Sequence, residues 1–195
     1  MTHTTHSKLG YTYGMPFNAT KVLYHLSRSA QWRDASPLCE GLFDPHIWTW
    51  LNDQQSLTQR LIDVSNGAFT VDLLMQKVGI PLWHEQDCLQ QFHHLAATVR
   101  EVCLNIHAEP IVLARSIIPL SLIRQHQNGL TDLGRQPLGQ LLFREGRVRV
   151  SRRQFTQVSF GKSTVYGRRI LSIKKAELYS TFLRANVWPF NDINT

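Results

Sequence analysis

Between residues 44 and 66 the apolar residues recur at helical spacing. Asp44 followed by Pro45 is typical of a helix start, because aspartate accepts hydrogen bonds from the first free N–H groups and proline suits the first helical position. A second start is predicted at Ser56, and helical spacing continues from there until Asn66 and Gly67 signal a turn. The pattern therefore predicts two short helices between residues 44 and 66.

From residue 69 onward apolar residues occur at every second position, which is typical of strands with one buried face. Residues 69–75 form the first such run. The second half of residues 95–107 and residues 111–119 form two more, joined by a short polar connection. A helical stretch over 120–143 is interrupted by glycines and a proline. Further short strands are predicted over 148–150, 155–160, 165–173 and 176–183. We therefore predict an α+β fold, an antiparallel sheet of about six strands with helices on one face.

The length and composition fit one folded domain. The chain has 195 residues, of which 43% are hydrophobic and 18% charged, as in ordinary globular proteins. Residues 1–31 show weak periodicity, so we interpret them as a loose N-terminal extension and residues 32–195 as a single domain. No apolar run reaches the roughly 18 residues of a membrane span, and the polar start lacks a secretory signal. We expect a cytoplasmic protein without stable membrane insertion.

The cysteines and histidines do not indicate a disulfide framework or a metal site. The three cysteines, Cys39, Cys88 and Cys103, are odd in number and widely spaced. Neither a C-x-x-C pair nor an H-E-x-x-H motif occurs. We therefore expect no bound metal.

Basic residues are concentrated in the second half of the chain. The formal net charge is +7, and residues 143–184 hold eleven Lys and Arg against two acids. Such a segment indicates either a nucleic-acid or membrane face or an enzyme for an anionic small molecule. The aromatic residues do not alternate with the basic ones as a stacking platform requires, so we favour the small molecule and expect no nucleic-acid partner.

Two arginines fall on the apolar faces of neighbouring predicted strands. Period-two alternation puts Arg100 on the apolar face of one strand and Arg115 on the apolar face of the next. The apolar residues on these faces are Val102, Leu104 and Ile106 in the first strand, and Ile111, Leu113 and Ile117 in the second. A buried guanidinium without an anionic partner is very costly, so each arginine should meet an anion.

The identity of that anion has two interpretations. One is a structural ion pair with Glu85, Glu101 or Glu109. The other, which we favour, is a pocket for a carboxylate ligand, because the guanidinium fork binds a carboxylate through two hydrogen bonds. The glycine-rich segment 133–139 is a weaker signal for the same kind of site, since a turn before a helix offers free N–H groups to an anion.

Several short blocks of sequence keep a characteristic order. The most specific are A-R-S-x-x-P over residues 114–119 and P-L-G-x-x-L-F over residues 137–143. Weaker blocks are residues 50–51, 56–58, 60–61, 99–102, 166–169 and 182–183. Together these blocks resemble the chorismate lyase family over roughly residues 32–185.

The resemblance implies a fold, an activity and a set of site residues. It implies an antiparallel sheet whose ligand pocket is enclosed under helical flaps, and conversion of chorismate to 4-hydroxybenzoate and pyruvate in ubiquinone biosynthesis. No cofactor is implied, and we expect a monomer. By position, Arg100 matches a ligand-binding arginine of the family, Leu138 a backbone contact and Leu57 a residue on the first flap. Arg115 lies close to the same pocket.

The last strand departs from the family pattern. The family has a glutamate just before a Phe-Leu pair, and alignment on residues 182–183 puts Ser180 at that position. A shorter hairpin would let Glu177 fill the role instead, which turns the opposite face of the strand toward the pocket. We favour Glu177 because the chemistry needs an acid.

Three other functions compete with the lyase. Effector domains of certain bacterial transcription regulators share the chorismate lyase fold and would bind a small aromatic acid without catalysis. The unmatched start is shorter than the DNA-binding helix-turn-helix that such a sensor needs. A catalytically inactive homologue would be favoured by Ser180 in the glutamate position, and a nucleic-acid-binding module by the basic second half.

Overall fold

The computed structural model describes residues 19–89, 96–120, 123, 150–160, 163–172 and 178–184. Five helices lie within these residues: α1 (Ala19–Ser29), α2 (Pro37–Glu40), α3 (Pro45–Leu51), α4 (Leu57–Val64) and α5 (Trp83–Cys88). Seven strands accompany them: β1 (Arg33–Asp34), β2 (Phe69–Gly79), β3 (Ala97–Ile106), β4 (Glu109–Pro119), β5 (Val150–Phe160), β6 (Ser163–Ser172) and β7 (Leu178–Arg184).

The two helix starts predicted from the sequence are confirmed. The Asp44 carboxylate accepts hydrogen bonds from the backbone N–H groups of His46 and Ile47 at the start of α3. The Ser56 hydroxyl accepts one from the N–H of Gln59 at the start of α4. Each cap satisfies N–H groups that have no partner within the helix, which fixes where the helix begins.

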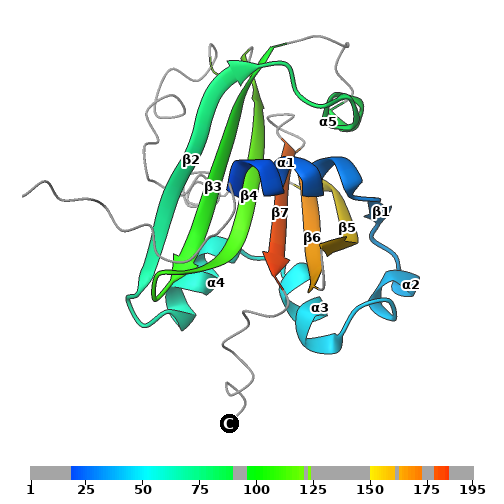
Figure 1. Cartoon of the computed structure of the whole chain (residues 1–195). Coiled ribbons are helices and arrows are strands. Elements are labelled where there is room, and N and C mark those ends of the chain that lie inside the picture. Colours follow the sequence, from blue (N-terminus) through cyan, green and yellow to red (C-terminus); the bar gives the residue numbers. More distant parts are fainter. Residues whose placement is uncertain are drawn as a thin grey trace, which may run out of the picture.

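The strands form one antiparallel sheet in the order β1-β5-β6-β7-β4-β3-β2 (Figure 1). The α+β class is confirmed, with seven strands in the described residues against about six predicted. The two predicted strands 148–150 and 155–160 fall in one strand, β5, at least from residue 150. The polar run between them, residues 151–154, hid its continuity from a search for apolar alternation.

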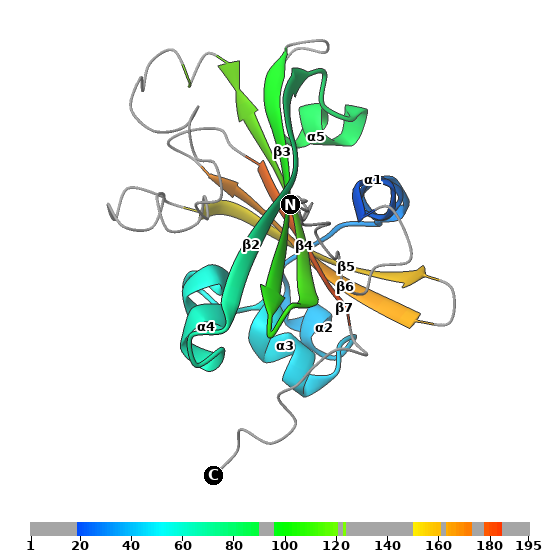
Figure 2. The same cartoon turned by 60° about the vertical axis from the view of Figure 1, so that its left-hand side comes forward.

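The prediction that helices lie on one face of the sheet is wrong. Residues of α3 and α4 pack with Val102 and Leu104 of β3, whereas residues of α1 pack with Cys103, which points to the opposite face. Figure 2 shows α1 and α5 on one side of β3 and α4 on the other. All ten residues of β3 are consequently buried. We call the side with α3 and α4 the flap face and the side with α1 and α5 the back face.

The prediction of a loose extension to residue 31 is wrong for residues 19–29, which form α1. Val22, Leu23 and Leu26 are buried on the back face, where α1 crosses the strands in Figure 1. These three residues form a narrow apolar stripe along the helix. The stripe is wide enough to bury one side of α1 against the sheet. Residues 1–18 lie outside the described residues, and a domain boundary at residue 32 stays a prediction. None of the described helices has the length and apolar character of a membrane span.

Candidate functional site

Arg100 lies in the middle of the sheet on the flap face. It is directly opposite Gln76 of β2 and Ser116 of β4, and its side chain is only 2% exposed. Its Nη1 donates a hydrogen bond of 2.7 Å to Oε1 of Gln76. Burial lowers the pKa of the Arg100 guanidinium. The predicted inward placement of this arginine is confirmed, and Gln76, which sequence reasoning missed, helps to orient it.

Leu57 lies on the same face of the sheet as Arg100. It is the first residue of α4 and is buried in the core cluster that includes Val102, two residues beyond Arg100 along β3. Side chains two residues apart on a strand share a face. The structure therefore brings two of the predicted ligand-binding residues to one side of the sheet, the side on which α4 packs.

Arg115 lies on the back face, so the expectation that both arginines line one pocket is wrong. Its register partner on β3 is Glu101, the neighbour of Arg100, and successive residues point to opposite faces. Arg115 Nε and Nη2 donate to the two carboxylate oxygens of Glu85 at 2.7 and 3.1 Å. Its Nη1 donates to Glu101 Oε1 at 2.5 Å. The alternative interpretation, a structural ion pair, is confirmed for Glu85 and Glu101.

Charge neutralisation explains how Arg115 tolerates its position. Burial by itself lowers the pKa of the Arg115 guanidinium, but the hydrogen bonds and negative charges of Glu85 and Glu101 raise it overall. Because Glu85 belongs to α5 and Arg115 to β4, the pair also ties α5 to the back face of the sheet. A buried pair of this kind fixes the position of the helix more than it stabilises the fold.

A second arginine, Arg169 of β6, extends the polar cluster of the back face. It donates to Oε1 of Gln154 through Nε (2.9 Å) and Nη2, and its Nη1 lies 3.3 Å from Nδ1 of His84. The guanidinium also lies over the Trp32 ring, 4.7 Å from its centroid. The pKa of His84 is lowered, first by burial and further by the positive charge of Arg169 and Arg115. The folded protein therefore favours the neutral imidazole of His84 over the protonated form.

Only one of the two candidates for the acid on the last strand falls within the described residues. Position 180 of β7 is in register with Arg115 of β4 and Arg169 of β6. Position 179 is in register with Ser116, the partner of Arg100. Glu177 and Leu138 lie outside the described residues, as do nearly all of residues 120–143, where an interrupted helical stretch was predicted.

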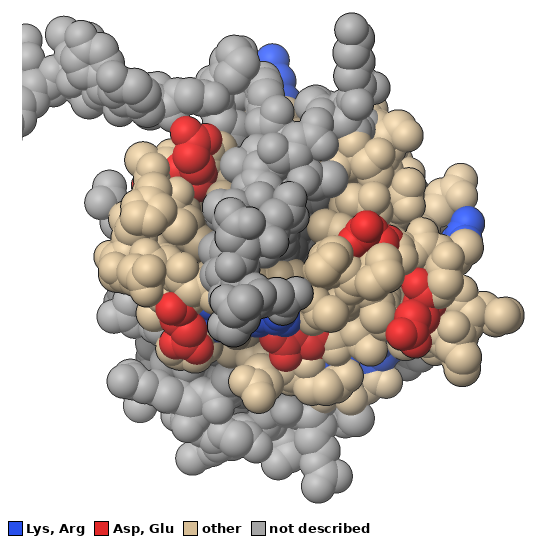
Figure 3. Space-filling model, turned by 90° about the horizontal axis from the view of Figure 1, so that it is seen from below, with Lys and Arg blue, Asp and Glu red and all other residues tan. Residues whose placement is uncertain are grey.

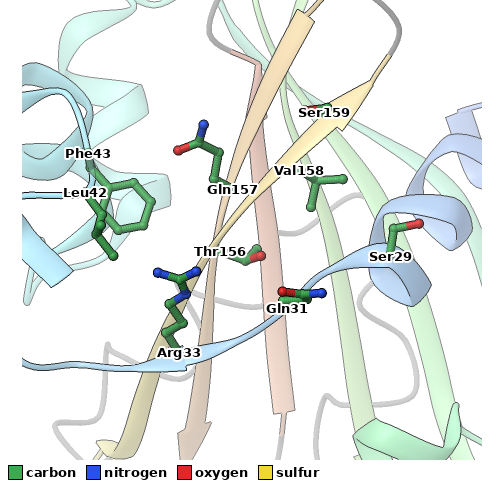
Figure 4. Close-up of a pocket in the computed structure, with 9 residues that line it drawn as sticks. All are labelled: Ser29, Gln31, Arg33, Leu42, Phe43, Thr156, Gln157, Val158 and Ser159. Carbon is green, nitrogen blue, oxygen red and sulfur yellow. The ribbon is translucent and has the colours of Figure 1, made fainter.

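Two hollows among the described residues are lined by none of the predicted site residues. One has a volume of about 430 Å³ beside β5, where Thr156 lies between Gln31, Arg33 and Gln157, and Phe43 lies at one side (Figure 4). The other is an open groove of about 770 Å³ beside the turn between α3 and α4. No group of three metal-ligating side chains is found in the described part of the chain.

Buried arginines account for part of the basic character of the chain. Arg100, Arg115, Arg168 and Arg169 are all buried, although arginine is usually exposed. The underside of the molecule, where α2, α3 and α4 lie, shows several Asp and Glu side chains and few Lys or Arg (Figure 3). The positive charge that suggested a nucleic-acid surface is thus partly internal.

Comparison with known proteins identifies the family. The sequence model described as "Chorismate lyase" matches residues 26–189. A protein of Pseudomonas putida named "Probable chorismate pyruvate-lyase" is 38% identical over 127 residues, which is 65% of this chain and 69% of that protein. A protein of the same name from Pseudomonas aeruginosa is 30% identical over 166 residues, which is 77% of this chain and 91% of that protein. For a third protein of this name, from Thiobacillus denitrificans, the match covers 51% of this chain and 53% of that protein.

Solved structures with a similar arrangement include bacterial transcription regulators. A GntR-family regulator from Enterococcus faecalis superposes with a TM-score of 0.48 at 14% identity, covering 62% of this chain and 97% of that chain. A GntR-family regulator from Bacillus cereus gives a TM-score of 0.47 at 7% identity, covering 66% and 99%. The sequence match extends over most of the chain, from α1 to beyond β7. This chain belongs to the chorismate lyase family.

Proposed function

We propose that this protein is a chorismate pyruvate-lyase, which converts chorismate to 4-hydroxybenzoate and pyruvate in the first committed step of ubiquinone biosynthesis. The observation that carries the proposal is the family match over residues 26–189 together with the burial of Arg100 on the flap face, under α4. The fold supplies a cationic group inside an apolar wall, as recognition of a small aromatic carboxylate requires. No cofactor is needed, and the working protein is a cytoplasmic monomer.

In this reaction a proton leaves the ring carbon that bears the hydroxyl. The ether C–O bond then breaks with its electron pair, and enolpyruvate departs and takes up a proton as pyruvate. The remaining ring is aromatic, which supplies much of the driving force. The protein has to hold the substrate and stabilise the developing negative charge.

Arg100 binds the ring carboxylate in this proposal, and Gln76 holds its guanidinium in the orientation that the ligand meets. The backbone N–H of Leu138 assists, and Leu57 forms part of the apolar wall. Arg115 does not bind the substrate in this proposal, because it donates hydrogen bonds to Glu85 and Glu101 on the back face. Its role is to hold α5 and the neighbouring strand in place.

Glu177 is the residue that we propose to bond the ring hydroxyl or to move a proton. The register of β7 supports this choice over Ser180, since position 180 is in line with Arg115 and Arg169 rather than with Arg100. An acid that acts beside Arg100 has to come from the other set of alternating positions, that of residue 179, which is in register with Ser116. We propose that Glu177 has this orientation.

The test is an assay of the purified protein with chorismate and a metal chelator, in which pyruvate and 4-hydroxybenzoate are measured together. Equal amounts of both products support the lyase. Arg100→Ala should then lower kcat/KM by about two orders of magnitude, because a charge-assisted hydrogen bond to the carboxylate is lost. Arg152→Ala, at an exposed arginine paired with Asp34, is the matched control.

The alternative function is a non-catalytic binding protein for a small aromatic acid. The observation that favours it is a serine, not an acid, at position 180, the position aligned on the Phe-Leu pair. Binding of 4-hydroxybenzoate without any turnover of chorismate would select this alternative. Glu177→Gln and Ser180→Ala separate the two assignments of the acid, since only one of them should abolish turnover.

A further inference from the structure

Three arginines converge on the turn that joins α3 to α4. Arg168 comes from β6, Arg153 from β5 and Arg60 from α4, and all three reach the backbone at the carboxyl end of α3. Together they donate hydrogen bonds to every backbone carbonyl of residues 49–53. The pairs are Thr49 with Arg60 (2.8 Å), Trp50 and Leu51 with Arg168 (3.5 Å each), Asn52 with Arg153 (3.3 Å) and Asp53 with Arg168 (2.9 Å).

The physical reason for this arrangement is the end of the helix. The last carbonyls of a helix lack partners within it, and they carry the partial negative charge of the helix dipole. Arg168 is only 3% exposed, and burial with the nearby charge of Arg153 lowers its pKa to about 10. The guanidinium therefore stays charged at neutral pH, where it is held by carbonyl oxygens and by the charge of Asp53.

Further contacts connect this turn to the start of α4. Asp53 accepts a hydrogen bond from the N–H of Gln55 (2.8 Å) and pairs with Arg60 (3.0 Å), whose guanidinium lies over the Trp50 ring. The next residue after this short link is the helix cap that precedes Leu57. Only residues 54–56 separate Asp53 from Leu57, and hydrogen bonds at Gln55 and Ser56 hold part of this link.

We propose that Arg60, Arg153 and Arg168 form a carbonyl clamp that positions Leu57 in the ligand site, with Arg168 as its central positioning residue. This inference rests on the proposed function for the role of Leu57, but the clamp itself does not. It implies that the turn between α3 and α4 is held in one position relative to strands β5 and β6.

The first test is amide hydrogen exchange over residues 52–57 in the wild type, Arg168→Gln and the control Arg152→Gln. The clamp predicts that exchange of this segment rises at least about tenfold in Arg168→Gln, while exchange of the β3 amides changes much less. Unchanged exchange in this segment would overturn the clamp. Arg60→Gln, at the more exposed end of the clamp, gives the same readout if Arg168→Gln does not fold.

The second test is a double-mutant cycle on 4-hydroxybenzoate affinity, measured by titration calorimetry. Arg168→Gln and Leu57→Ala should each weaken binding about tenfold, and the double variant should be no more than about threefold weaker than the worse single variant, because both remove the same contact. Independent losses, which multiply to about a hundredfold, would overturn the positioning role. A wild type that binds no 4-hydroxybenzoate refutes the proposed function, and hydrogen exchange then decides the clamp.

Discussion

Replacing Glu85 with alanine should lower the free energy of unfolding by about 4 kcal/mol. Both oxygens of this carboxylate accept hydrogen bonds from Arg115, at 2.7 and 3.1 Å, and both side chains are almost fully buried. Removing one partner of a buried ion pair costs about 3–5 kcal/mol, because the other charge is left without compensation. Since Glu101 still faces Arg115, the lower end, about 3 kcal/mol, applies to the pair.

Glu85 has a second role that adds to this figure. Its Oε2 accepts a hydrogen bond of 2.8 Å from the backbone N–H of Leu82, at the start of α5. Loss of such a cap costs about 1 kcal/mol, which brings the expected total to about 4 kcal/mol. The helix is only six residues long, so we expect it to lose its place on the back face in the variant.

The measurement is urea-induced unfolding at pH 7, followed by circular dichroism. Asp63→Ala is the control, because this exposed carboxylate accepts a hydrogen bond from Gln59 on the surface of α4 and its loss should cost no more than about 0.5 kcal/mol. The double variant Glu85→Ala with Arg115→Met should be less destabilised than the sum of its single variants. A cost below about 1 kcal/mol for Glu85→Ala would refute the reasoning.

Three further outcomes are expected. Ala108 has a φ of +64° in the tight turn between β3 and β4, so Ala108→Gly should raise the free energy of unfolding by about 1 kcal/mol, measured in urea. Burial lowers the pKa of His84 below its ordinary value of 6.5, so its neutral form supports the fold above that pH. Stability should be lost as the pH falls from 6.5 through the lowered pKa, and a melting-temperature profile of His84→Gln should be flatter over this window. Asp44→Ala removes two hydrogen bonds from the start of α3 and should cost about 1 kcal/mol in thermal unfolding, and Asp44→Asn should restore most of it.

Local signals accounted for the elements near the site. The caps at Asp44 and Ser56 and the alternation from residue 69 predicted α3, α4 and the strands β2 to β4, because capping and pleating depend on residues close in sequence. The helix α1 was not predicted, because its apolar stripe is narrow. The stripe is buried only by packing against the sheet, which local sequence does not show. The motif blocks led to the family without any knowledge of the sheet order.

What the sequence determined is which residues of each strand share a face. It put Arg100 with the apolar residues of its own strand, and the structure confirms that placement. What only the tertiary structure decided is how one strand is aligned with the next. The register of the β3–β4 hairpin puts Arg115 opposite Glu101, so two arginines that each looked inward lie on opposite faces of a sheet that has a core on both sides. The contact of Arg168 with the carbonyl of Asp53 joins residues 115 positions apart, and no local pattern predicts a pairing that depends on how the whole chain folds back on itself.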